Sequence, residues 1–300
     1  MSSRLAGLML AAVLIAPAYG ASCPPAGYSR AQLVALKATG FEIADDARRQ
    51  TLALELLDCL DNPDPSLRDG IAFEAYYTWL RAERIDLGTR RELLNRLLGM
   101  LDPTMPDRAG FRRPFAVLAL AEVARTDRIA PWMEDLERNT VLNRGVDYFE
   151  SLRDYRGFDA REGWRHGVAH GADLLTQLAL NPAFGKPQLD RLLAALASQI
   201  MPPGEHAYTD GEPERLARVL LVAAQRGLHT AEDWDAWFRR LLEPAPDLPW
   251  AQAYTSRAGL SRRHNLAAFL FATYVNARES NSPGVEALLP GLRTAIKALP

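Results

Sequence analysis

The stretch Gly163-Trp164-Arg165-His166-Gly167-Val168-Ala169-His170-Gly171-Ala172-Asp173 opens the segment on which we base the fold class. Apolar residues recur at intervals of three and four through this segment, which predicts a helix over 162–180. The same helical period dominates the chain from Ser29 onward, whereas alternating apolar and polar runs of strand length are absent. We therefore predict an all-α protein.

The remaining predicted helices are separated by short clusters of Pro, Gly and Asp, which stop one helix and turn the chain into the next. A first helix begins at the capping-box sequence Ser29-Arg30-Ala31-Gln32. The others cover 46–60, 66–83, 89–101, 112–125, 131–139, 146–155, 187–200, 213–226, 231–242, 257–278 and 285–299. Because no long polar linker interrupts them, we expect a single helical domain over 21–300.

Five predicted helices begin with a charged or histidine pair followed by an apolar stripe. Representative positions are Arg68, Arg113, His166, Arg215 and Arg263, with successive spacings of 45, 53, 49 and 48 residues. This range is typical of HEAT or armadillo-like hairpins, which stack into an α-solenoid because one hairpin cannot bury its own apolar face. The alternative is that helices of an ordinary all-α protein fall at these intervals by chance.

The first twenty residues resemble a secretory signal peptide. Arg4 precedes the apolar run 5–15, and small residues follow up to Gly20 and Ala21. The apolar run is shorter than the roughly 20 residues that span a bilayer, and no longer run follows it. We expect cleavage near Gly20, no membrane span in the mature protein, and a periplasmic or secreted location.

Cys23 and Cys59 are the two cysteines of the chain, and in an oxidising compartment they predict one disulfide. Two separate buried thiols, or a lipid anchor on Cys23, are the alternatives. Removing Arg4 with the signal peptide changes 35 basic residues to 34 against 37 acidic ones, a net charge of −3. The basic residues alternate with acids, so we expect no nucleic-acid partner.

His166, His170 and Asp173 are spaced four and three residues apart, which places them on one helical face. Two imidazoles and a carboxylate are ordinary ligands of a divalent metal such as zinc, although the glutamate of the zincin motif is absent. The alternative is a buried polar network with Arg153, Arg156 or a neighbouring helix. No cofactor is expected on the second interpretation.

Gly167 and Gly171 border this face, and glycine inside a helix costs about 1 kcal/mol relative to alanine. We expect a neighbouring helix or a ligand to approach the backbone there. A loop over 203–213, which has His206, Asp210, Glu212 and Glu214 in it or beside it, is a candidate to fold over the same surface; a polar loop that caps a helix is the alternative. A nucleophile elbow, a phosphate-binding glycine loop and a Cys-x-x-Cys pair are all absent from the sequence.

Several blocks of the sequence resemble the bacterial family known as domain of unknown function 2785. They are Leu67 to Phe73, Arg153 to Gly157, Gly163 to Asp173 and Glu214 to Ala217, in that order, and the similarity extends over about Phe41 to Asn276. The resemblance implies an exported all-α protein and singles out the same histidine helix. It implies no activity.

Together these observations predict a helical-repeat binding module for a protein, a peptide or a small polar ligand. A metal-dependent hydrolase centred on His166, His170 and Asp173 is the alternative function. The residues expected at the binding surface are Asp69, Arg113, Arg156, Trp164, His166, His170, Asp173, Arg215 and His264.

Overall fold

A computed structural model describes residues 22–243 and 249–299. The predicted signal peptide and Ala21 lie outside the described residues. Within the described part, the chain is all-α apart from one very short hairpin, in agreement with the predicted class. No helix of these residues is long and apolar enough to cross a membrane.

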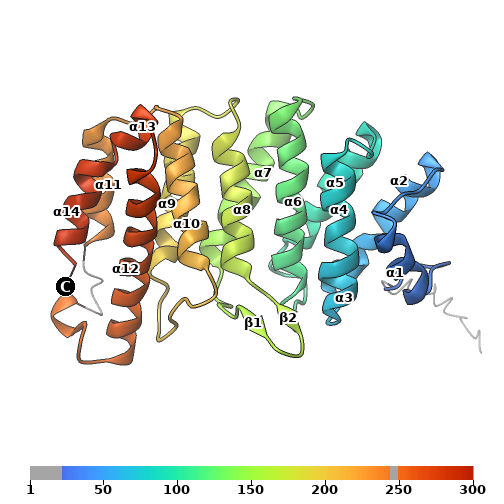
Figure 1. Cartoon of the computed structure of the whole chain (residues 1–300), viewed down its shortest axis with the longest axis horizontal. Helices are drawn as coiled ribbons and strands as arrows, with labels where there is room; N and C mark the ends of the chain where they lie inside the picture. Colours follow the sequence, from blue (N-terminus) through green and yellow to red (C-terminus); the bar gives the residue numbers. More distant parts are fainter. Residues whose placement is uncertain (1–21, 244–248, 300) are drawn as a thin grey trace, which may run out of the picture.

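The helices stand side by side in two rows (Figure 1). The front row consists of α4 (Glu74–Arg81), α6 (Arg112–Ile129), α8 (Gly167–Leu180), α10 (Glu212–Gln225) and α12 (Arg257–Arg278). The back row consists of α5 (Leu87–Met100), α7 (Asp135–Ser151), α9 (Lys186–Ile200) and α11 (Ala231–Leu241). Within the front row each helix packs on the next, as stacked hairpins require. The finer assignment to the HEAT or armadillo type stays a prediction.

Shorter elements close the two ends of the rows. At the N-terminal end are α1 (Arg30–Ala38), α2 (Asp46–Glu55), the 3-10 helix η1 (Leu56–Asp61), α3 (Pro65–Leu67) and the π-helical turn η2 (Arg68–Phe73). At the C-terminal end are the 3-10 turn η3 (Trp250–Gln252), α13 (Pro283–Glu286) and α14 (Leu289–Lys297), with α14 packed on α11 and α12.

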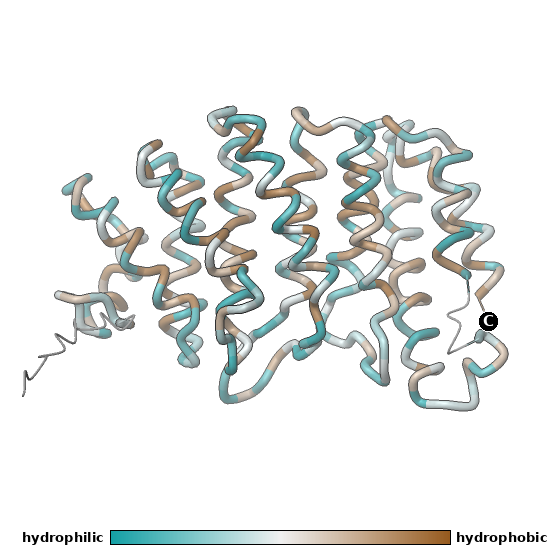
Figure 2. Tube along the Cα trace, turned by 180° about the vertical axis from the view of Figure 1, so that it is seen from behind, coloured by the Kyte–Doolittle hydropathy of each residue, from teal (hydrophilic) through white to brown (hydrophobic). Residues whose placement is uncertain are grey.

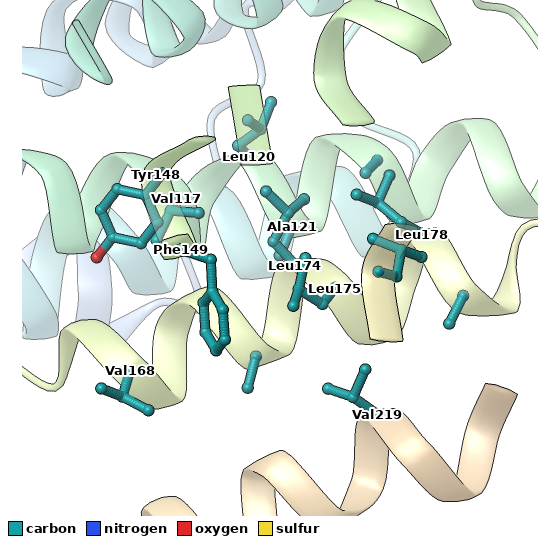
Figure 3. Close-up of a cluster of buried hydrophobic side chains, with 14 of the residues drawn as sticks. Val117, Leu120, Ala121, Tyr148, Phe149, Val168, Leu174, Leu175, Leu178 and Val219 are labelled. Carbon is teal, nitrogen blue, oxygen red and sulfur yellow. The ribbon is translucent and has the colours of Figure 1, made fainter. Parts of the chain in front are cut away.

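The core lies between the rows and between successive front helices. Figure 3 shows Val117, Leu120 and Ala121 of α6 facing Leu174, Leu175 and Leu178 of α8, all of them buried. Phe149 of α7 and Val219 of α10 close this cluster from the neighbouring helices. Seen from behind, brown apolar segments alternate with teal polar ones along each helix, as expected for helices with one buried face (Figure 2).

Two predicted helix boundaries were wrong around α7 and α8. The predicted helices 131–139 and 146–155 form one helix, α7, which passes through Gly145 without a break. A Cβ at Gly145 would lie 2.9 Å from Leu174 Cδ2, so this glycine permits close packing of α8 rather than ending a helix. The predicted start of 162–180 was also wrong, because α8 begins at Gly167.

The residues before α8 form an antiparallel hairpin, which the sequence analysis did not predict. Strands β1 (Phe158–Asp159) and β2 (Gly163–Trp164) pair Phe158 with Trp164 and Asp159 with Gly163. The Asp159 carboxylate accepts hydrogen bonds from the backbone N–H groups of Arg161 and Glu162, at 2.8 and 2.9 Å, which stabilises the turn. Two-residue strands are too short to give an alternating pattern in the sequence.

The predicted disulfide is present between Cys23 and Cys59, which are separated by 36 residues. The bond joins the N-terminal segment to η1, and both sulfur atoms are consumed by it. It therefore excludes the two alternatives, separate thiols and a thioether-linked lipid on Cys23.

The disulfide predicts a defined mass change. Reduction of the purified protein should raise its intact mass by about 2 Da. It should also lower the thermal stability, because the unfolded chain without the disulfide has a higher conformational entropy. Intact mass spectrometry and thermal unfolding with and without reductant test this. Two thiols titrated in the native unreduced protein would contradict it.

Close approach of α7 explains the glycines of α8. A Cβ at Gly171 would lie 2.5 Å from Phe149 Cδ2, and one at Gly167 would lie 3.1 Å from Tyr148 Oη. We therefore predict that Gly171→Ala lowers the free energy of unfolding by about 1–3 kcal/mol through overpacking.

Gly99 of α5 provides the matched control for this substitution. No atom lies within 4 Å of a Cβ built there, so Gly99→Ala should stabilise the protein by about 0.5 kcal/mol. Chemical denaturation of both variants measures the difference, and equal effects at the two positions would rule out close packing as the cause.

Candidate functional site

A cleft of about 770 Å³ crosses the front row from α4 to α10. Six of the nine residues expected at the binding surface line it, although they come from segments up to 146 positions apart in the chain: Asp69, Trp164, His166, His170, Asp173 and Arg215. Asp210 of the loop 203–213 and Glu214 of α10 also line the cleft, whereas His206 and Glu212 do not. This cleft is the candidate functional site.

Three residues predicted for the same surface lie elsewhere. Arg113 lines a separate cavity beside Asp107 and Tyr148. Arg156 bonds Asp154, and its Nε donates to the Asp154 carboxylate at 2.8 Å. His264 bonds the carbonyl of Tyr208 at 3.1 Å and lines a different groove on α12. These three residues therefore do not share the cleft with the other predicted binding residues.

The hairpin places the aromatic wall of the cleft. Trp164 of β2 is about one-third exposed, and its ring stacks on His166 with centroids 4.6 Å apart. His166 has a left-handed backbone conformation, φ 53°, and it occupies the N-cap position of α8 rather than the helix itself. This turn carries the chain from the hairpin into the helix, so the position of Trp164 depends on how the hairpin is held.

The side chain of Arg68 fixes the position of the β1–β2 hairpin. Its side chain is fully buried, and Nη2 donates hydrogen bonds to the carbonyls of Glu162 and Trp164, at 2.7 and 3.3 Å. Its guanidinium group lies over the Phe111 ring, 3.9 Å from the centroid. Arg165 lies 4.4 Å from the same ring centroid, so Phe111 contacts two guanidinium groups. Arg68, one of the five helix-start positions with regular spacing, is thus a structural residue.

Both imidazoles of the cleft have tautomers fixed by backbone carbonyls. His170 Nδ1 lies 3.1 Å from the carbonyl oxygen of Pro114, and His166 Nε2 lies 2.9 Å from that of Asp210. A carbonyl only accepts, so each of these nitrogens carries the proton, and the other nitrogen of each neutral ring is an acceptor. Burial lowers the pKa of His166, and it lowers that of His170 to about 3.

The pKa values of the carboxyl groups beside the imidazoles are shifted in the opposite direction. Burial raises the pKa of Asp173, although the ion pair with Arg215 opposes this shift. Burial likewise raises the pKa of Asp69 at the π-helical turn, against the effect of the adjacent Arg68 guanidinium. Perturbed titratable groups that converge in one cleft are typical of functional sites.

The predicted metal ligands are engaged in other interactions. Asp173 pairs with Arg215, and one nitrogen of each histidine is bonded to a carbonyl. Among residues 22–243 and 249–299, no three His, Cys, Asp or Glu side chains are arranged to hold a metal ion. The polar network that was the alternative interpretation of His166, His170 and Asp173 describes these contacts, and its arginine, Arg215, comes from the neighbouring helix α10 rather than from position 153 or 156.

Burial of His170 makes stability depend on pH. The unfolded chain protonates this histidine below about pH 6.5, whereas the folded chain does so only near pH 3, so the free energy of unfolding falls as the pH decreases through this window. The effect is at most about 1.4 kcal/mol per pH unit. The nearby groups His166, Arg215 and Arg68 all favour the neutral form of the His170 imidazole. The raised pKa values of Asp69, Asp173 and Glu212 have the opposite effect, because these groups make the folded chain more stable as the pH decreases.

The variant His170→Asn isolates this contribution, because its amide can donate to the Pro114 carbonyl but does not titrate. The stability difference between wild type and His170→Asn should shift in favour of the variant as the pH is lowered from 7 to 5. Urea unfolding at several pH values measures it. His264→Asn is the matched control, since that exposed histidine makes a similar carbonyl bond. A pH-independent difference for His170→Asn would contradict the assignment.

A family model shows how this chain is related to known proteins. A family model described as protein of unknown function (DUF2785) matches residues 103–275, which include the hairpin, α8 and the cleft residues of α6 and α10. The resemblance had suggested a longer extent, from about Phe41. Neither the curated proteins nor the solved structures contain a match to this chain. The match covers more than half of the sequence, and the chain therefore belongs to the DUF2785 family of proteins of unknown function.

Proposed function

We propose that this protein is a binding module whose front-face cleft takes a small polar ligand or a peptide segment rich in hydrogen-bond donors. The observation that carries the proposal is the fixed tautomer of His170 at the cleft floor. Because Nδ1 carries the proton and donates it in a hydrogen bond to the Pro114 carbonyl, Nε2 of the neutral ring can only accept a hydrogen bond. A ligand N–H or O–H group complements this nitrogen.

The charges of the cleft favour the same class of ligand. Five carboxylate residues line it against three arginines. Arg81 and Arg215 are paired with Glu122 and Asp173, so a large part of the positive charge is already compensated by the protein. The remaining acceptors are complementary to ammonium, guanidinium, amide or hydroxyl groups.

The aromatic side chains supply apolar surface beside these polar groups. Trp164, Tyr77 and Phe73 line the cleft together with Phe115, whose ring meets His170 edge to face at 5.1 Å. An apolar lining with a few convergent polar groups is typical of ligand sites. The lining residues of the cleft extend along the row from α4 to α10, which suits a short peptide as well as a compact ligand.

The hairpin offers a matched pair of variants to test the proposal. Trp164 lines the cleft, whereas its strand partner Phe158 does not. A panel of short peptides, polyamines and amino sugars is screened by thermal shift, and the strongest ligand is titrated by calorimetry. Trp164→Ala should weaken binding about tenfold or more, and Phe158→Ala should leave it within about twofold.

A second comparison tests the polar half of the cleft. Asp173→Asn removes the charge of a cleft carboxylate with little change of shape, and we expect it to weaken a cationic ligand more than a neutral one. No stabilising ligand in the panel, or equal affinity in all three variants, would contradict the proposal. One zinc per chain by elemental analysis of untagged protein would instead favour the hydrolase alternative.

A further inference from the structure

A second cavity, of about 360 Å³, is lined by residues from the start of α6 and the end of α7. Arg113, which the sequence analysis expected at the binding surface, lines this cavity together with Arg153. Arg153 and Asp154 belong to the block 153–157, and no residue of that block lines the cleft. The cavity and the cleft have no lining residue in common, so the cavity is a separate candidate site.

The two carboxylate groups of the cavity are already engaged by the protein. Asp107 accepts hydrogen bonds at 3.0 to 3.2 Å from three backbone N–H groups of the segment 110–113. Two of these groups belong to the first turn of α6, so this helix end is satisfied without a ligand. Asp154 accepts hydrogen bonds from two nitrogens of the Arg156 side chain. Although burial opposes the shift, these bonds hold the pKa of Asp154 below its usual value.

The guanidinium groups of the cavity, by contrast, retain donors without acceptors. The side chain of Arg113 makes no hydrogen bond with any residue that the structure describes, and its buried Nε lies 3.7 Å from Asp107 Oδ2. Arg153 is held by Nη1, which donates to two carbonyl groups at the end of α7 at 2.6 and 2.8 Å. Its guanidinium group also interacts with the neutral Tyr155 hydroxyl group. Among residues 22–243 and 249–299, no carboxylate forms an ion pair with Arg153.

The charge around this cavity is positive. A Cβ at the lining residue Gly110 would lie 2.7 Å from both Arg156 Nη2 and Asp154 Oδ2, so Arg156 contributes to the same wall. Arg165 is also close to Gly110, but Glu162 compensates its charge through an ion pair of 2.6 Å. The other three guanidinium groups stand against two carboxylate groups, which leaves one positive charge in excess. The cleft has the opposite balance, with more carboxylates than arginines.

We propose that this cavity binds a small oxyanion, whose phosphate or carboxylate group is held by Arg113 and Arg153. Guanidinium groups bind both kinds of group through paired N–H···O bonds, whereas an ammonium ligand has no acceptor for them. The volume suits a ligand at the small end of the range that protein cavities bind. The proposal does not rest on the function proposed for the cleft.

Inorganic phosphate and citrate test the proposal on the full chain. Each is titrated by calorimetry and by thermal unfolding, with sodium chloride at the same ionic strength as the reference. We expect one or both to bind saturably and to raise the melting temperature by about 2 °C or more at concentrations well above Kd, because a ligand that binds only the folded chain stabilises it. Binding of phosphate alone assigns the site to phosphate groups, and binding of citrate alone assigns it to carboxylates.

Three variants locate the bound anion. Arg113→Gln and Arg153→Gln should each weaken binding about tenfold or more, because each removes charge-assisted hydrogen bonds. Arg218→Gln is the matched control, since this arginine lines the cleft and not the cavity, and it should leave the affinity within about twofold. The melting temperature without ligand shows whether each variant folds. Arg113 makes no side-chain hydrogen bond with the described residues, so its substitution should change this temperature little.

Three results would overturn the proposal. The first is the absence of saturable binding of either anion. The second is stabilisation that is equal in the wild type and in Arg113→Gln, which would show a general salt effect. The third is loss of binding in Arg218→Gln alone, which would place the anion in the cleft.

Discussion

The buried guanidinium group of Arg68 is the constraint on which the candidate site depends. A charged side chain with no exposed surface is stable only where its donors find acceptors. Arg68 donates to the carbonyls of Asn62 and Pro63 close in sequence, and to those of Glu162 and Trp164 almost a hundred residues later. Its polar requirements therefore fix two distant segments against each other, with Phe111 packed on its flat face.

The consequences of this contact extend into the cleft. The segment held by Arg68 contains the strand that carries Trp164, and the chain then turns through His166 into α8. On its other side, the turn is fixed by the His166 bond to the carbonyl of Asp210 and by the close contact of Gly157 with the Asp210 side chain. The wall and floor of the cleft are thus positioned by the π-helical turn η2, the β1–β2 hairpin and the loop before α10. Each of these three segments precedes a different helix of the front row.

The same arrangement gives the front row two surfaces of different chemistry. The cleft between α4 and α10 combines neutral imidazoles, paired arginines and an excess of carboxylates. The exposed side of α12 instead carries the apolar side chains of Leu260, Phe271 and Val275. Stacked helices generate such surfaces readily, because equivalent positions of successive helices face the same way and each can be varied without disturbing the buried side.

The sequence by itself determined the helical class, most helix positions, the capping of α1 and the identity of the cysteine pair. These features depend on local periodicity, on side chains within one turn and on residue counts. It also placed His170 and Asp173 on one face, since that follows from the helical period alone. The tertiary structure decided the rest, because regular spacing does not fix which side of a row a side chain faces. Arg68 is buried and Arg113 faces another cavity, while Arg156 and His264 lie away from the cleft. For Gly167 and Gly171 the sequence predicted the close approach of a helix or a ligand, and the tertiary structure decided that the neighbour is α7.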